Sequence, residues 1–215
     1  GLTIRNGGGT DFGAGIRGSI GPETVDMQTV RFHTRARILH NWFHGNVTND
    51  VAGSAGGAIW RVDGIIEGNV IGKASNPNKA NRGAGLALCH GTIRQNIIWY
   101  NESHDVDSSA GGGAAWRCID LRQNWMFKNK ARFGGALFEC GSFAAVPNFQ
   151  RATGPPPGVV HYSPHGRQLI QCNIITQNEA TTGGNGGALY GCSGRIENNT
   201  IAYNEALTGG LIGGV

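Results

Sequence analysis

The chain has 215 residues, 37 of them glycine, with 39% hydrophobic residues, 15% charged residues and a formal net charge of +4. Only 7 prolines and the lack of a three-residue glycine period exclude a collagen helix, and the many aromatic and branched aliphatic residues exclude a disordered chain. No apolar run approaches the roughly 18 residues of a membrane-spanning helix, so we expect no membrane span.

The first residues resemble a coil of a repeat that becomes regular further along the chain. Leu2–Gly7 and Gly13–Ile16 read as an opening coil. The residues between Ile16 and Ile38 fit the repeat worst, and we expect a shortened or bulged coil there.

From about residue 38 onwards, two signatures alternate. The first is a glycine-rich entry into a short strand, and it starts at Gly56 (GGAIWRV), Gly83 (GAGLALC), Gly112 (GGAAWRC), Gly134 (GGALFEC), Gly186 (GGALYGC) and, truncated, at Gly209. The second is centred on an asparagine, at Asn41, Asn69, Asn96, Asn124, Asn173 and Asn199. The steps between these asparagines are 28, 27, 28, 49 and 26, so the period is about 27 residues with one insertion.

These repeats predict an all-β fold, because the units are rich in β-branched residues and lack the apolar spacing of a helix. Three short strands per unit would form one coil, and about seven coils would stack into a parallel β-helix. We expect one domain over residues 1–215, with residues 141–166 as an inserted loop.

Aligned copies assign a role to each column of residues. The asparagines are expected at a bend with positive φ, where their amides can bond along the stack, and Asn46, Asn101, Asn129, Asn178 and Asn204 form a second such column. Aliphatic columns are expected to fill the core, together with the column Val62, Cys89, Cys118, Cys140 and Cys192. The four cysteines of this column are expected to be free thiols. The column Trp42, Val70, Ile97, Trp125 and Ile174 either faces outward as a docking stripe or turns inward at the bend.

Two literal motifs carry a resemblance to a known family. Gly56–Ile59 reads GGAI and Phe43–Asn46 reads FxxN, and the chain from about Ile38 to Val215 resembles the right-handed parallel β-helix repeats of chlamydial polymorphic outer membrane proteins and of large secreted bacterial proteins. The resemblance implies a right-handed β-helix, export, and an extracellular or cell-surface location.

Four arginines form an outward basic set, Arg61 and Arg117 on the first strand with Arg94 and Arg122 on the second. Arginines at a regular rise can bind the carboxylate or sulfate groups of an anionic polysaccharide, in keeping with a sequence pI of about 9.0. They can equally serve solubility, and both interpretations stay open. The scattered basic residues and the lack of a recognition motif argue against a nucleic-acid partner.

The inserted loop carries the main candidates for catalysis. His161 and His165 could act as acid and base beside Arg117 if the loop walls a groove, as in polysaccharide lyases and related β-helix enzymes. The alternative is a proline-stiffened surface loop. Asp105 and Asp107 could share a calcium ion but lack the glycine-rich acidic repeat of calcium-binding β-rolls, so we expect no metal site and no cofactor.

The leading hypothesis is therefore a non-enzymatic extracellular scaffold or surface protein that binds anionic glycans. The alternative is a polysaccharide lyase or glycoside hydrolase. Both ends of the chain read as incomplete coils, which predicts either a piece of a longer β-helix or self-association, head to tail or side by side.

Overall fold

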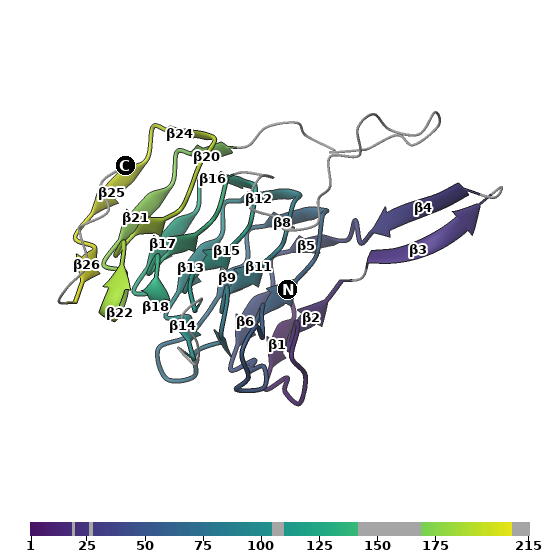
Figure 1. The fold of residues 1–215 in the computed structure, drawn as a ribbon, viewed down its shortest axis with the longest axis horizontal. Coiled ribbons are helices and arrows are strands. Elements are labelled where there is room, and N and C mark those ends of the chain that lie inside the picture. Colours follow the sequence, from purple (N-terminus) through teal and green to yellow (C-terminus); the bar gives the residue numbers. More distant parts are fainter. Residues whose placement is uncertain (19, 26–27, 105–109, 142–168, 208–215) are drawn as a thin grey trace.

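The computed structural model describes residues 1–18, 20–25, 28–104, 110–141 and 169–207. All regular structure in these ranges is strand, arranged as stacked coils with the first and last strands at opposite ends (Figure 1). Four of the sheets are parallel throughout, and the chain visits them in a fixed order within each coil. The predicted parallel β-helix is confirmed.

Each parallel sheet takes one strand from successive coils. Sheet A contains β1 (Thr3–Arg5), β6 (Trp42–His44), β9 (Val70–Ile71), β13 (Ile97–Trp99), β17 (Trp125–Phe127), β21 (Ile174–Thr176) and β25 (Thr200–Ala202). Sheet B contains β10 (Lys79–Ala80), β14 (Glu102–Ser103), β18 (Lys130–Phe133), β22 (Glu179–Asn185) and β26 (Glu205–Ala206). Sheet C contains β2 (Ile16–Arg17), β7 (Ile59–Trp60), β11 (Leu86–Ala87), β15 (Ala115–Trp116), β19 (Leu137–Phe138) and β23 (Leu189–Tyr190). Sheet D contains β5 (Arg37–Leu39), β8 (Ile65–Glu67), β12 (Thr92–Arg94), β16 (Asp120–Arg122), β20 (Leu169–Gln171) and β24 (Arg195–Glu197).

A complete coil runs from sheet D through A and B to C, so it has four strands where the sequence predicted three. The missed strands belong to sheet B, and most of them are only two residues long. A two-residue strand shows no alternation of polar and apolar residues, which is the signal on which a sequence prediction depends.

The core lies inside the stack and follows the predicted columns. Ile66, Ile93 and Leu121 on sheet D and Ile71 and Ile98 on sheet A are fully buried. Cys89, Cys118 and Cys140 are fully buried in this core, and Cys192 is partly buried against it. All four are free thiols, as predicted, and so is Cys172. Burial raises the pKa of Cys118 and Cys140, which keeps both thiols neutral.

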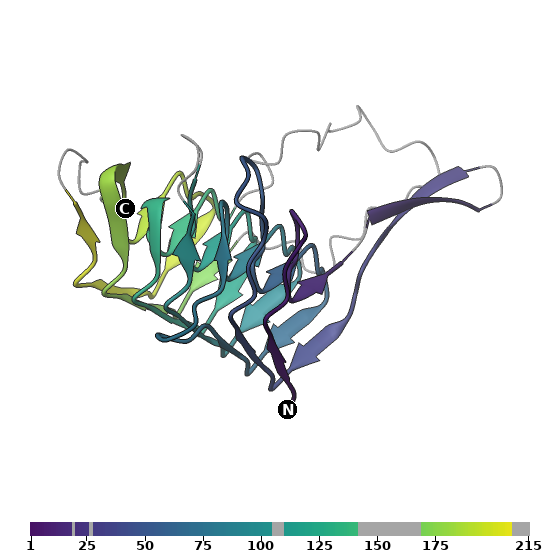
Figure 2. The same ribbon diagram turned by 90° about the horizontal axis from the view of Figure 1, so that it is seen from below.

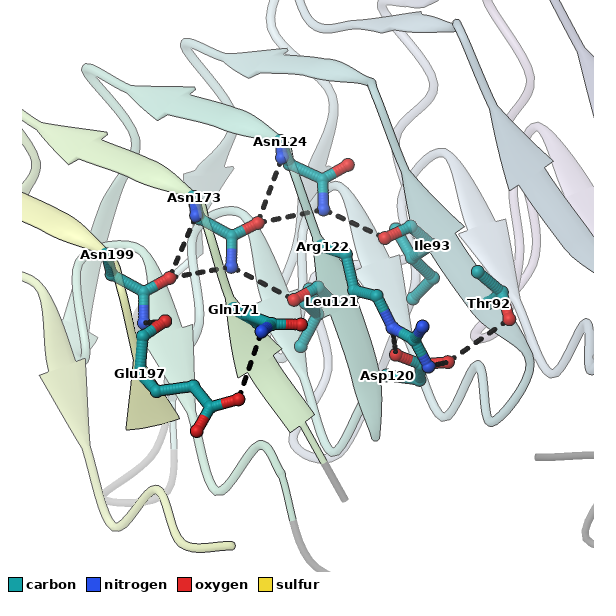
Figure 3. Close-up of polar contacts among 10 residues, drawn as sticks. All are labelled: Thr92, Ile93, Asp120, Leu121, Arg122, Asn124, Gln171, Asn173, Glu197 and Asn199. Atoms are coloured by element: carbon teal, nitrogen blue, oxygen red, sulfur yellow. Dashed lines mark hydrogen bonds and ion pairs between the residues drawn. The ribbon is translucent and has the colours of Figure 1, made fainter. Parts of the chain in front are cut away.

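Two asparagine ladders run along the bends on either side of sheet A. In the first, the backbone N–H and the Nδ2 of Asn124 both donate to Oδ1 of Asn173 (Figure 3). The backbone N–H and the Nδ2 of Asn173 donate in the same way to Oδ1 of Asn199. Each Nδ2 also donates to a carbonyl in the preceding coil, for example from Asn124 to Ile93. Because the amides of Asn124 and Asn173 are buried, their bonds satisfy groups that water cannot reach.

The expected positive φ at the ladder asparagines is wrong. The left-handed residue is the one before each predicted ladder asparagine, such as His40 (φ 55°), Gln95 (φ 55°) and Gln123 (φ 53°). That residue makes the turn and leaves the asparagine amide directed along the stack. The second ladder also contains Asn78, which the sequence alignment missed because additional residues precede it.

The expected shortened coil between Ile16 and Ile38 is an antiparallel hairpin. Strands β3 (Ile20–Val25) and β4 (Gln28–His33) pair with each other and project away from the stack (Figures 1 and 2). The hairpin enters the chain between a sheet C strand and a sheet D strand. The predicted insertion at residues 141–166 also falls between a sheet C strand and a sheet D strand in the chain order, β19 and β20. Apart from Gly141, it lies outside the described residues.

Candidate functional site

The outward column of sheet C is aromatic at most positions. In register, its members are Arg17, Trp60, Ala87, Trp116, Phe138 and Tyr190. Trp60, Trp116 and Phe138 point away from the main core, yet each is more than nine-tenths buried because they pack in a second apolar cluster with Phe12 and Phe133. Phe12 stacks on Trp60 with ring centroids 4.9 Å apart. The sheet thus presents indole rings in fixed positions.

Arginines lie on both of these indole rings. The guanidinium carbon of Arg61 lies 4.3 Å from the centroid of Trp60, and that of Arg17 lies 5.3 Å from it. Two coils further on, Arg117 and Arg82 lie 4.7 and 5.2 Å from the centroid of Trp116. A guanidinium group over an indole face is stabilised by the ring quadrupole. These four arginines with Trp60 and Trp116 are called the Arg–aromatic corner below.

Arg61 and Arg117 hold equivalent positions directly after their tryptophans. Both adopt positive φ, 53° and 51°, at the turn that ends the sheet C strand. Arg117 is neutralised, because its Nε lies 2.6 Å from Oε2 of Glu139, and that same oxygen accepts a hydrogen bond from Nε1 of Trp116. Arg117 is therefore held in a structural ion pair.

Arg61 differs because no carboxylate lies within ion-pair distance of it among the described residues, and the same holds for Arg17. Burial lowers the pKa of the Arg61 guanidinium; the nearby Asp63 raises it in part, and Arg17 lowers it further. Within the described part of the chain, Nε1 of Trp60 is buried and has no acceptor. We call Arg17, Trp60 and Arg61 the Trp60 cluster. It brings two positive charges together, and among the described residues neither guanidinium group has a carboxylate at ion-pair distance.

Arg94 and Arg122 lie on a different surface, the outer face of sheet D. They are neighbours in one column, but Arg94 pairs with Glu67 at 3.0 Å. Arg122 binds both carboxylate oxygens of Asp120, at 2.5 and 2.7 Å, and Asp120 also accepts a hydrogen bond from Thr92 (Figure 3). The four predicted arginines thus occupy two surfaces, and only Arg61 lacks an acidic partner in the described structure.

The other candidate residues cannot be placed. His161 and His165 lie outside the described residues, as do Asp105 and Asp107. Within the ranges that are described, no three histidine, cysteine or acidic side chains gather as a metal site would require. Sequence reasoning missed Arg17, Trp60 and Arg82, although the repeated Trp-Arg pair at residues 60–61 and 116–117 is a visible signal.

The apolar column of sheet A faces outward, which decides between the two interpretations left open by the sequence. Trp42 and Ile97 are each 37% exposed, Trp125 is 46% exposed and Ile174 is 47% exposed. Together with Val70, these residues are called the sheet A stripe.

Comparison with known proteins gives no match: no protein-family model, no curated protein and no solved structure corresponds to the chain. Among the residues described, there is also no helix of the length and apolar character needed to cross a bilayer.

Proposed function

We propose that the protein is a non-catalytic β-helix scaffold that binds anionic polysaccharide at the Trp60 cluster, with an extracellular or cell-surface location. The observation that carries the proposal is the pair Arg17 and Arg61, held on Trp60 with no carboxylate at ion-pair distance among the described residues. The GGAI and FxxN motifs agree with a surface protein of the polymorphic outer membrane type.

The chemistry of the cluster favours a carboxylate or sulfate group as its ligand. Planar guanidinium groups bind carboxylate or sulfate with two parallel hydrogen bonds. Trp60 holds Arg61 in place, so less side-chain entropy is lost when a ligand binds. A bound anion would offset the repulsion between Arg17 and Arg61 that contributes to the lowered Arg61 pKa.

The test is the affinity for a defined acidic glycan, with oligogalacturonate and a sulfated oligosaccharide as probes. We expect Arg61→Gln to weaken binding by about tenfold, because it removes a charged hydrogen-bond donor, and Arg17→Gln to weaken it in the same direction. Arg94→Gln is the matched control, because Arg94 is exposed but already paired with Glu67. Binding should also fall as salt is added.

Equal affinity of Arg61→Gln and Arg94→Gln, or no binding of either acidic probe, would contradict the proposal. Cleavage of a probe would instead favour the alternative, a polysaccharide lyase or glycoside hydrolase that uses residues 141–166. That outcome is read in the same samples by following the length of the oligosaccharide.

A second function is favoured by the sheet A stripe, which we propose pairs two copies side by side. In an antiparallel arrangement centred on Ile97, Trp42 of one copy meets Ile174 of the other, and Trp125 meets Val70. Large side chains would then face smaller ones, as close packing requires. Burial of this exposed apolar surface supplies the driving force.

Sedimentation velocity across protein concentration tests the pairing. We expect wild type to dimerise and Trp125→Lys to stay monomeric, because a charge would be buried without a partner. Tyr203→Lys is the control, since Tyr203 is 86% exposed and lies off the stripe. A wild-type monomer at high concentration, or equal dimerisation of the two variants, would exclude side-by-side pairing through the stripe.

A further inference from the structure

A hollow of about 320 Å³ opens at the corner between sheets A and B, away from the Arg–aromatic corner. Its lining includes Ala74, Pro77, Tyr100, Glu102, Lys130 and Glu179. No motif in the sequence points to this place. The volume lies in the range of small-molecule sites, and the lining joins one aromatic ring with groups of both charges.

The hollow exists because one coil carries a longer turn than the coils that follow it. Residues 72–78 connect β9 to β10, whereas only Tyr100 and Asn101 connect β13 to β14. The longer turn is fixed to the preceding coil, since the carbonyl of Asn76 accepts a hydrogen bond from the Gly45 N–H at 2.9 Å. Ala74 and Pro77 therefore form a wall held in place by the fold.

Turn residues of successive coils line the hollow beside this wall. Tyr100, Lys128 and Gln177 all have positive φ, at 50°, 53° and 55°, and they occupy equivalent positions one coil apart. Nζ of Lys128 lies 5.4 Å from the centroid of the Tyr100 ring. The ring of Trp99 packs edge-on with that of Tyr100, with ring centroids 5.3 Å apart. The phenol ring is thus held by its neighbours.

The outward column of sheet B supplies the polar groups. Glu102, Lys130 and Glu179 are aligned one coil apart. Nζ of Lys130 lies 2.7 Å from Glu179, and Glu102 is bound at 2.9 Å by Lys79 from the preceding coil. Acidic and basic side chains alternate along this column, so the hollow has hydrogen-bond donors and acceptors but no strong excess of either charge.

We infer that the hollow binds a neutral saccharide. Carboxylate oxygens accept hydrogen bonds from hydroxyl groups, and the lysine ammonium donates to ring and hydroxyl oxygens. Tyr100 is only partly covered by Lys128 and Trp99, and the rest of its ring can contact the C–H groups of a sugar. A polyanion would gain little net attraction, because the charges of Glu102 and Glu179 offset those of Lys128 and Lys130. An apolar ligand would remove water from these charged groups without replacing its hydrogen bonds. This site is separate in place and in ligand from the Trp60 cluster, so it does not depend on the function proposed above.

The experiment is saturation-transfer NMR followed by calorimetric titration of the full chain with neutral methyl hexosides and α- and β-linked disaccharides of glucose, galactose and mannose. We expect at least one of these sugars to bind, and both Tyr100→Ala and Glu102→Gln to weaken that binding by about tenfold or more. The last coil offers matched controls, because Tyr203 and Glu205 are the equivalents of Tyr100 and Glu102 but do not line the hollow.

Tyr203→Ala and Glu205→Gln should bind the sugar as wild type does, and so should Arg61→Gln. The site is disproved if none of the neutral sugars binds, or if the Tyr203 and Glu205 variants lose as much affinity as the Tyr100 and Glu102 variants. Glu102 is half-exposed, so Glu102→Gln keeps the test valid even if Tyr100→Ala fails to fold.

Discussion

Replacing Gly134 by alanine is expected to destabilise the protein by about 3–5 kcal/mol, which would be one of the largest effects of any single substitution. Gly134 has φ 57°, and a Cβ atom at this position would lie 2.0 Å from the carbonyl oxygen of Leu137. The added atom must therefore displace the backbone of the sheet C strand. The free energy of unfolding, measured by urea denaturation, gives the cost.

Gly183→Ala is the matched control. Gly183 has φ 78°, but a Cβ atom there would meet nothing within 4 Å. It should therefore lose only the intrinsic cost of the left-handed conformation, about 1–2 kcal/mol. Equal losses at Gly134 and Gly183 would show that the close carbonyl contact has no energetic role.

The same contact explains why the glycine signature recurs through the sequence. In the equivalent position of every described coil, φ is between 55° and 68° and a Cβ would lie 2.0–2.7 Å from the carbonyl oxygen three residues ahead; these glycines are Gly13, Gly56, Gly83, Gly112, Gly134 and Gly186. Only glycine satisfies both conditions.

Asn124→Ala is expected to cost about 2–4 kcal/mol, because it breaks the ladder in the middle of the stack. Asn124 is 1% exposed, and its Oδ1 accepts from both the N–H and the Nδ2 of Asn96. Alanine would leave the buried Asn96 N–H and the Ile93 carbonyl without these partners. Urea denaturation again measures the loss of stability.

Asn199→Ala tests whether burial decides this cost. Asn199 makes the same kinds of bond, to Asn173 and Ile170, but it lies in the last described coil and is only partly buried. Water can replace part of its hydrogen bonding, so we expect about 1 kcal/mol. A loss at Asn199 as large as that at Asn124 would contradict the account of the ladders.

Columns that repeat in every coil could be predicted from the sequence, because their physical requirement repeats as well. Gly112 and Asn124 are examples of such columns, and both lie at the positions that the alignment predicted. Features that occur once could not be predicted. The hairpin at residues 20–33 and the long turn at 72–78 break the period, and their shapes follow from local pairing that the repeat does not encode.

The candidate site could be predicted only in part for a related reason. Arg61 and Arg117 have the same sequence context, Trp-Arg before a small turn, yet their environments differ in the next coil. Arg117 meets Glu139 there, whereas the position beside Arg61 holds Leu88. The pairing of a charge in a β-helix depends on the neighbouring coil. The sequence therefore predicted Arg61 and Arg117 as basic candidates, and the structure shows that, among the described residues, only Arg117 of these two has an acidic partner.

The most direct test of the proposed function is the set of five tryptophan indole N–H signals in a ¹H–¹⁵N spectrum, recorded while oligogalacturonate is added to wild-type protein. Trp60 lies under Arg61 and Arg17, whereas Trp42 and Trp125 lie on the outer face of sheet A. Anion binding at the Trp60 cluster predicts that the Trp60 signal shifts with saturation while the Trp42 and Trp125 signals stay in place. Saturating shifts at Trp42 and Trp125 with an unchanged Trp60 signal, or no shift at any indole, would contradict it.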